Sequence, residues 1–280
     1  MNLLHNSNHL NNQTILAFKT YLLVWLAPDM ISLCNYDPGT NEIISLKSFN
    51  CTKEDLTNID SLIPEVHSLK MNYRKKILIY SGQRFTLVPD RFMENHELAE
   101  KYFYINFSRE EKESLHNDYI EPLKTYNIFG IDETAQKLVE HIDFDIVFHS
   151  ISSYLRTILS TLNISEPNSI FIDIQNTYFT ISLFQYGILQ LCNSFPYKTS
   201  EDILYHIINI SKHFNLDTDK ETYRFSGILY PDSPLYNLIY KYIRQPELIM
   251  HPSGLNYHSS LYSIPQHIYF NVFALATCVS

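Results

Sequence analysis

The sequence predicts an α/β protein made of two halves that share the element order βββαβαβα. In the stretch 168–209, three apolar runs are separated by Gln175-Asn176-Thr177 and by the turn at Tyr186-Gly187, and a helical pattern begins at Thr199. The segment from residue 21 to about residue 70 repeats this order of three strands and a helix. Hydrophobic residues make up 45% of the chain and charged residues 18%, which is enough apolar material for a sizeable core. Mixed sheets with helices packed on their faces follow from this alternation.

The first half begins with a segment, residues 1–18, that we expect to be mobile. The predicted strands are 21–26, 30–36 and 42–49, each apolar and bounded by turn residues. Thr52 and Asp55 approximate a capping box, so a helix is predicted to begin there. The remaining predicted elements are strands 76–80 and 85–89, helix 95–103, strands 118–126 and 127–131, helix 133–142, strand 144–148 and helix 151–162. The first domain is therefore predicted to span residues 1–165, with an insertion within 76–118.

The second domain is predicted to span residues 166–280, after the linker Ser165-Glu166-Pro167-Asn168. Its first three strands and the helix from Thr199 are those of the central stretch. The later elements are predicted as strand 221–229, helix 233–243, strand 247–250, a polar loop over 251–262 and a closing apolar helix over 266–277. The two halves thus repeat a pattern rather than identical residues.

Composition excludes several classes of protein. The chain has six glycines, none near another, and no glycine-rich phosphate-binding motif of the P-loop or Rossmann type. The net charge of −9 argues against a nucleic-acid or anionic-membrane partner. No segment approaches the ~18 uninterrupted apolar residues of a membrane span. Four widely separated cysteines indicate buried, reduced thiols, so we expect a cytoplasmic location.

The chain resembles the actin-like ATPases, whose cell-division and pilus-assembly members are built from two ribonuclease-H-like halves. More closely, it looks like a family of uncharacterised bacterial proteins with an actin-like ATPase fold and no known activity. The resemblance is carried by apolar patterns around a few turns, from about residue 20 onwards. These segments are Ile77–Gly82 with Phe85–Pro89, Phe148-His149-Ser150, Phe171–Pro196 and Phe225–Tyr242.

The resemblance implies a nucleotide site whose residues are mostly missing from this chain. Active members carry Asp-x-Gly at the turn between the first two strands of each half, where glycine admits phosphate and aspartate holds Mg²⁺ or water. The corresponding place in the first half reads Ala27-Pro28-Asp29. In the second half Asp173 matches, but Gln175 stands at the glycine position and should crowd a phosphate. Of the adenosine-side Gly-Gly, only Gly227 remains.

Other candidate sites have simpler explanations. Asp173 could be a surviving metal ligand, but a lone aspartate at a strand end more often hydrogen-bonds its own turn. His149 could be a base, but without a neighbouring nucleophile we expect it to bind a backbone carbonyl. His206 and His213 share a helix face but lack a third zinc ligand. The tyrosines Tyr230, Tyr236, Tyr240 and Tyr242 either form a partner surface or cover the sheet.

Two functions remain open on the sequence. The first is a degenerate actin-like protein, a pseudo-ATPase that acts as a binding or scaffold module for an unidentified protein partner. It would have no catalytic residue, no metal and no cofactor. The second is a divergent nucleotide-dependent ATPase or phosphotransferase that uses ATP and Mg²⁺ through Asp29 and Asp173, with Gly227 beside the nucleotide. Polymerisation of the actin type is neither supported nor excluded.

Overall fold

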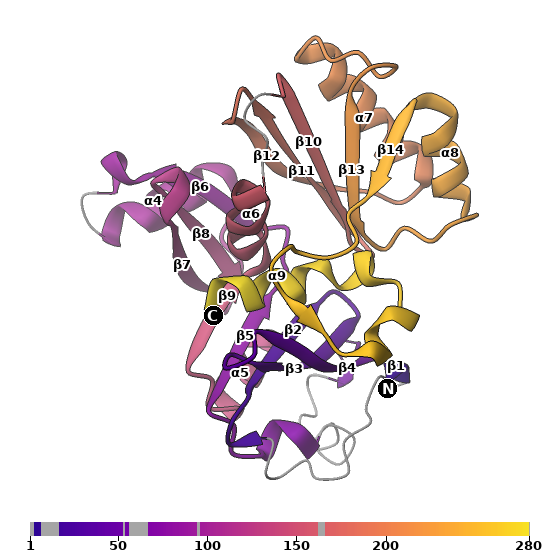
Figure 1. The fold of residues 1–280 in the computed structure, drawn as a ribbon. Helices are drawn as coiled ribbons and strands as arrows, with labels where there is room; N and C mark the ends of the chain where they lie inside the picture. Colours follow the sequence, from indigo (N-terminus) through magenta and orange to yellow (C-terminus); the bar gives the residue numbers. More distant parts are fainter. Residues whose placement is uncertain are drawn as a thin grey trace. The chain divides into compact units, whose positions relative to one another are not determined.

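The computed structural model describes residues 3–6, 17–52, 54–55, 67–93, 96–161 and 166–279. The chain divides into two compact units, coloured along the sequence in Figure 1. The first comprises Met1–Thr157, Pro252–Ile264 and Asn271–Ser280, and the second comprises Ile158–His251 and Pro265–Phe270. The C-terminal segments therefore divide between the units, which differ in this respect from the predicted domains 1–165 and 166–280.

The main sheet of the first unit has the strand order β1-β4-β3-β2-β5-β9, and β15 also pairs with β4. Strands β2, β3 and β4 are antiparallel neighbours, whereas β5 is parallel to β2 and β9 is parallel to β5. The bounds are β1 Leu3–Asn6, β2 Tyr21–Ala27, β3 Met30–Asp37, β4 Glu42–Asn50, β5 Lys75–Tyr80, β9 Ile146–His149 and β15 Asn256–Tyr257. Every residue of β2 is buried, as its unbroken apolar sequence predicts.

Helices of the first unit begin where the sequence provides side-chain caps. Asp132 accepts the amide of Ala135 at the start of α5, Glu133–His141. Thr52 and Asp55 form the predicted reciprocal cap, but the rest of that helix lies outside the described residues. Helix α6, Ser150–Thr161, passes from the first unit into the second, and α9, Phe270–Val279, ends the chain. The Thr157 hydroxyl bonds the Ala274 carbonyl and the Thr277 hydroxyl, which joins α9 to α6 within the first unit.

A small antiparallel sheet, β6-β8-β7, forms the insertion in the first unit. Its strands are β6 Phe85–Pro89, β7 Ser114–Ile120 and β8 Thr125–Ile131, and helix α4, His96–Asn106, packs on one face. That contact buries Val88, Ala99, Phe103 and Ile128. Because β8 pairs with both β6 and β7, the insertion extends to Ile131 rather than ending within the predicted range 76–118.

The second unit repeats the strand pattern of the first. Its sheet has the order β12-β11-β10-β13-β14, with β10, β11 and β12 antiparallel and β13 and β14 parallel to their neighbours. The strands are β10 Asn168–Ile174, β11 Tyr178–Gln185, β12 Ile188–Pro196, β13 Thr222–Gly227 and β14 Gln245–Leu248. The helices α7, Ser200–His213, and α8, Pro234–Tyr242, are capped by Thr199 and Ser233. The order β12-β11-β10-β13-β14 corresponds to β4-β3-β2-β5-β9.

Alternation along the strands explains why α7 and α8 cover one face of this sheet (Figure 1). Successive side chains of a strand point to opposite faces, so one set faces the helices and the other faces away. The set on the helix side packs with Ile203, Ile207 and Ile239 of the two helices. It consists of Ile170, Ile172, Ile174, Phe179, Ile181, Leu183, Tyr223 and Phe225. The opposite set includes Asp173, Thr180, Ser182 and Ser226, all buried.

Three differences from the predicted elements have local causes. Residues 3–6, expected to be mobile, pair with β4 as β1. Two strands are present where 118–126 and 127–131 were predicted, but the boundary between them is wrong, because Glu121–Leu123 forms a short 3-10 turn, with Pro122 near its start, that separates β7 from β8. The C-terminal region contains β15 and further 3-10 turns that the sequence pattern did not predict. The remaining 3-10 turns are His67–Lys70, Asp90–Phe92, Ser259–Ser263 and Gln266–Tyr269.

Candidate functional site

The carboxylate of Asp173 is held inside the second unit. Asp173 is the penultimate residue of β10 and is buried. Its Oδ2 accepts a hydrogen bond of 2.7 Å from Gln175 Nε2, and its Oδ1 accepts one of 2.7 Å from Ser226 Oγ. Both oxygens therefore have donors from the protein, one of them from the strand's own turn as expected for an aspartate at this position.

Gln175 fills the position at which the resemblance requires glycine. Its backbone amide donates to Tyr178 O at 2.9 Å, which closes the two-residue turn between β10 and β11. Its carbonyl accepts from Tyr197 Oη at 2.6 Å, and its side chain is only 1% exposed. Gln175 Oε1 is buried without a hydrogen-bond partner among the described residues. A buried, five-atom side chain thus occupies the position that the resemblance assigns to glycine.

Gly227 is required by the sheet itself. It ends β13 opposite Ile174 with a φ of 82°, in the left-handed region. A Cβ at this position would lie 2.1 Å from the Ile174 carbonyl oxygen, so no other residue fits without movement. The next residue, Ile228, donates its amide to the same oxygen at 2.7 Å. The glycine therefore allows β13 to close against the end of β10, and a role beside a nucleotide stays a prediction.

Asp29 lies in the turn between β2 and β3 rather than at a strand end. Ala27 pairs with Met30, so Pro28 and Asp29 are the two turn residues. Asp29 has a φ of 61° and is exposed, which with proline before it matches a type II turn. Its carbonyl accepts the Cys51 amide at 2.9 Å.

The strand register shows that Trp25, not Asp29, corresponds to Asp173. Leu26 pairs with Tyr80 of β5 and Ile174 pairs with Gly227 of β13, and in each half the following amide donates to the strand-end carbonyl. Both turns have two residues, so the halves align without a gap, Trp25 with Asp173 and Ala27 with Gln175. The sequence-based comparison placed the first-half aspartate four residues too late.

Trp25 places an aromatic side chain where the second half has the carboxylate of Asp173. It is fully buried, and its indole Nε1 donates to Ser81 Oγ at 2.8 Å. The sequence does contain a signal for this correspondence, because the first predicted strand ends at Leu26 and the first apolar run of the second half ends at Ile174. Aligning the two halves at these ends, instead of at the nearest aspartate, would have matched Trp25 with Asp173.

His149 binds a backbone carbonyl, as predicted, and links the main sheet to the insertion. The Ile151 amide donates to its Nδ1 at 3.2 Å, which assigns the ring proton to Nε2. This Nε2 then donates to Gly82 O at 3.0 Å, and the Gly82 amide nitrogen lies 3.3 Å from it. The rings of Phe85 and Phe129 lie with centroids 5.3 and 4.9 Å from the imidazole. Burial lowers the pKa of His149 to about 3, so the ring is neutral.

Asp118 of β7 is the partner of the His149 backbone. Its Oδ2 accepts the His149 amide at 2.7 Å. Burial raises the pKa of Asp118 to about 6, and this hydrogen bond acts in the opposite direction. A neutral histidine and a buried carboxyl thus connect β9 with the inserted sheet.

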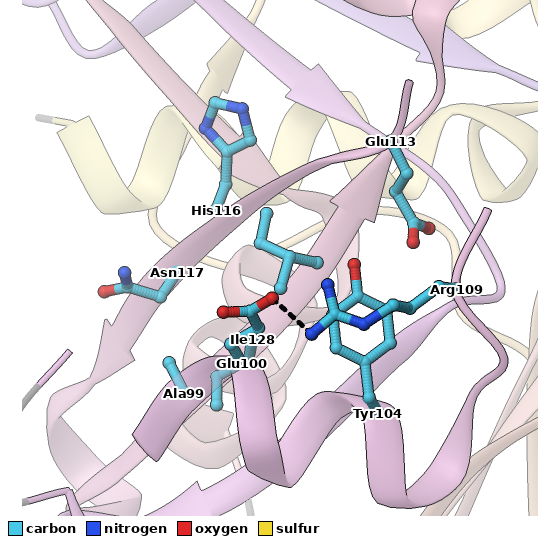
Figure 2. A pocket seen from close by; sticks show the side chains of 9 residues that line it. Ala99, Glu100, Tyr104, Arg109, Glu113, His116, Asn117 and Ile128 are labelled. Atoms are coloured by element: carbon cyan, nitrogen blue, oxygen red, sulfur yellow. Dashed lines mark ion pairs between the residues drawn. The ribbon is translucent and has the colours of Figure 1, made fainter. Parts of the chain in front are cut away.

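A pocket of about 410 Å³ lies on the insertion, between α4 and β7 (Figure 2). Arg109 crosses it, with a 2.6 Å ion pair to Glu100 and its guanidinium 4.2 Å from the centroid of the Tyr104 ring. A second hollow of about 610 Å³ shares Glu100, Tyr104 and Arg109 with the first. The other residues that line the first pocket are Ala99, Glu113, Leu115, His116, Asn117 and Ile128. None of these six other residues was singled out from the sequence.

The remaining sequence candidates are placed as follows. His206 packs on Phe195, with centroids 4.6 Å apart. Tyr236 and Tyr240 pack together at 4.5 Å, and Tyr240 is half exposed. Within the described ranges, no three His, Cys, Asp or Glu side chains gather closely enough to hold a metal ion. In the same part of the chain, no helix combines the length and apolarity that crossing a membrane requires.

Comparison with known proteins identifies the fold. The sequence model of a family described as "Protein of unknown function (DUF3822)" matches residues 9–245. No curated protein matches the chain. A crystal structure from Bacteroides thetaiotaomicron, of a protein with an actin-like ATPase fold and unknown function, is similar with a TM-score of 0.77 and 19% identity, over 97% of this chain and 100% of that one. A chain of the PilM-PilN type IV pilus biogenesis complex is similar with a TM-score of 0.65 and 11% identity, over 92% and 98%. The predicted actin-like ATPase fold is confirmed.

Proposed function

The chain belongs to the family described as "Protein of unknown function (DUF3822)" and has an actin-like ATPase fold, and we propose that it is a degenerate member that binds a protein partner instead of hydrolysing ATP. In this proposal the two lobes serve as a scaffold, and the strand-end positions that would hold phosphate and Mg²⁺ serve internal packing.

The observation that carries the proposal is the position of Gln175. A phosphate cradle needs backbone amides with open space before them, which glycine provides. At Gln175 the amide is used by Tyr178 O, and the buried side chain occupies the approach. The same side chain donates to Asp173, whose other oxygen is bonded by Ser226. Binding Mg²⁺ at Asp173 would require breaking these two hydrogen bonds inside the unit.

The first half supports the proposal in a different way. Trp25 offers an indole where an active half would offer a carboxylate, and Ala27 precedes Pro28, which has no amide hydrogen to donate. Asp29 is exposed on the turn, away from the equivalent position. A similar fold is found in the PilM-PilN type IV pilus biogenesis complex, which by its name joins two proteins. We carry that mode of action, binding of a protein, to this chain as part of the proposal.

Thermal unfolding with ATP and Mg²⁺ tests the nucleotide side of the proposal. We expect no rise in melting temperature at millimolar ATP with Mg²⁺, relative to Mg²⁺ alone. Bound nucleotide at about a hundred times its dissociation constant would add ~2.7 kcal/mol and raise the melting temperature by several degrees.

Two variants make this test decisive. Asp173→Ala removes the single matching carboxylate, and Gln175→Gly restores the residue of the Asp-x-Gly pattern. A rise in the wild type that Asp173→Ala abolishes would overturn the proposal in favour of an ATPase or phosphotransferase. A rise confined to Gln175→Gly would identify the glutamine side chain as the block, which supports the proposal directly.

A further inference from the structure

Strand β7 forms one edge of the inserted sheet, and the backbone groups of two of its residues, Leu115 and Asn117, have no partner among the described residues. The Gly130 amide donates to Arg84 O at 3.2 Å, so the backbone of Gly130 points towards β6. In an antiparallel sheet the direction alternates from residue to residue, so Phe129 and Ile131 point towards β7. Their partners in the register are His116 and Ser114. The amides and carbonyls of Leu115 and Asn117 therefore point outward, away from β8.

At the far end of the same edge the outward carbonyl is hydrogen-bonded, which confirms that these groups point away from β8. The carbonyl of Tyr119, two residues beyond Asn117, accepts a hydrogen bond from Arg156 Nη2 of α6. Tyr119 is in phase with Leu115 and Asn117, so all three carbonyls point to the outer side. No backbone or side-chain group of the described chain bonds the outward groups of Leu115 or Asn117, and Asn117 is exposed. The open edge is thus a short one, with Leu115 and Asn117 as its hydrogen-bonding residues.

The open edge borders the pocket on the insertion. Leu115 and Asn117 lie on the sheet face that α4 covers. Asn117 pairs with Ile128, which packs with Ala99 of that helix, and Leu115 packs against the same cluster. Both line the pocket of about 410 Å³ together with Glu100 and Tyr104 of α4. A strand added beside β7 would lie ~4.8 Å from it, and alternate side chains would enter this pocket. Figure 2 shows Asn117 on the strand and the Glu100–Arg109 pair across the hollow.

The open edge of β7 and the pocket beside it together form a groove. The negative charge around this groove favours a basic occupant. Residues 96–117 contain five glutamates against two lysines and one arginine, a net charge of −2, within a chain of net charge −9. Half of the Glu100 side chain is exposed although it pairs with Arg109. By contrast, Glu113 is bonded to Arg84 at 2.6 Å and only 3% of its side chain is exposed. Glu100 is therefore the carboxylate that an incoming cation can reach.

We propose that this groove binds an extended, basic segment of a partner protein, which pairs with Leu115 and Asn117 as a fourth strand of the inserted sheet and places a lysine or arginine at Glu100. This mode of recognition gains affinity from main-chain hydrogen bonds and specificity from alternate side chains. The inference rests on the proposed function as a binding protein and assigns its partner site.

A proline substitution can separate the backbone contribution from the side chain. Asn117→Pro removes the outward amide without removing a hydrogen bond to β8, which is the situation in which edge strands tolerate proline. Asn117→Ala removes the side chain and keeps the amide. Glu100→Arg reverses the charge in the groove, and Glu201→Arg, at an exposed position of helix α7 in the second unit, makes the same change in total charge elsewhere.

The probe is a random peptide library displayed on phage and selected against the full chain, with the enriched peptides synthesised and titrated by fluorescence polarisation. We expect peptides rich in lysine, arginine and β-branched residues. They should bind wild type and Glu201→Arg with similar affinity. They should bind Asn117→Pro at least tenfold more weakly than Asn117→Ala, which isolates the backbone amide from the side chain, and bind Glu100→Arg at least tenfold more weakly than wild type. Circular dichroism and thermal unfolding check that each variant is folded.

Amide hydrogen exchange provides a readout that does not depend on the proline variant. Bound peptide should slow exchange at Leu115 and Asn117, whereas His116 and Asp118, whose amides face β8, should already be protected. Peptides that bind without protecting these two amides, or that bind Glu100→Arg equally well, would overturn the groove while leaving a binding function intact. Failure to select any peptide would also overturn it.

A wild-type dimer that Asn117→Pro converts to monomer would assign the edge to a second copy of this chain instead. A nucleotide-induced rise in melting temperature would contradict the proposed function independently of all these results.

Discussion

The two halves of the molecule have the same strand order and the same two-residue turn, but they close the strand end with different chemistry. In the second half, Asp173, Gln175 and Ser226 form a buried polar cluster. In the first, Trp25 occupies the place of Asp173 and bonds Ser81 through its indole. The backbone framework thus tolerates either solution, because the sheet register is set by apolar alternation and not by the residue at this position.

The difference shows two ways in which this strand end can be closed in one chain. An aromatic ring removes the need for polar partners, whereas a carboxylate that remains buried must be given hydrogen-bond donors. Gln175 supplies one such donor from the turn itself. The polar cluster therefore satisfies the hydrogen-bonding needs of a buried aspartate.

The largest expected effect comes from the second half, at Gly227. Gly227→Ala places a Cβ 2.1 Å from Ile174 O at a φ of 82°, and we expect a loss of roughly 3–5 kcal/mol in the free energy of unfolding. Gly254→Ala is the matched control, because Gly254 has a φ of 83° with nothing within 4 Å of the added atom, and should lose about 1 kcal/mol. Urea unfolding measures both. Equal losses would show that the close approach of β13 to β10 is not limiting.

The next largest effect is a pH dependence of the free energy of unfolding that comes from the first half, where His149 and Asp118 are linked. His149 has a folded pKa of about 3, below its unfolded value near 6.5, so its stability contribution is lost as pH falls from about 6.5 towards 3. Asp118 has a folded pKa of about 6, above its unfolded value near 3.9, so its contribution increases as pH falls from about 6 to 4. The two should cancel in this window.

The substitution Asp118→Asn removes the contribution of the carboxyl group, so the pH dependence caused by His149 is no longer cancelled. Relative to the wild type, we expect the variant's free energy of unfolding to fall by about 1.4 kcal/mol for each pH unit between pH 6 and 4. Chemical unfolding at several pH values, with both proteins in the same buffers, provides the measurement. A difference that stays constant with pH would mean that Asp118 is ionised throughout the folded state in this range.

The smallest effect tests the equivalent positions directly. Trp25→Phe removes the indole donor and part of a buried ring, which should cost about 2 kcal/mol. Asp173→Asn should cost less than about 1 kcal/mol, because the Gln175 amide can rotate and present its unpartnered Oε1 to the new amide. Thermal and urea unfolding of the two variants rank them. A larger loss for Asp173→Asn would indicate that the charge of Asp173, and not only its hydrogen bonding, is needed at the strand end.

Much of the architecture could be predicted from sequence because it depends on local apolar patterns. The strands on both sides of Pro28-Asp29 and of Asn176-Thr177 follow from continuous apolar runs and turn residues. The boundary of β7 and β8 was placed wrongly, although Pro122 marks the turn. Strand β15 has only two residues, which is too few for a periodic signal.

The candidate sites were harder to predict because they depend on long-range register. Asp29 was selected as the aspartate nearest the turn, but the equivalent of Asp173 is defined by pairing with β5, more than fifty residues away. The groove beside β7 depends on which backbone groups point outward. That follows from a hydrogen bond between Gly130 and Arg84 and has no signature in composition.

The division of the C-terminal segments has a consequence for the order in which the molecule can form during synthesis. Residues 158–251 are continuous and supply nearly all of the second unit, so its sheet and both covering helices are complete as soon as they leave the ribosome. The first unit begins earlier but lacks Phe273 and Leu275, fully buried residues of α9, until the last residues emerge. The half that is synthesised first therefore receives these buried residues only after the second unit has been synthesised.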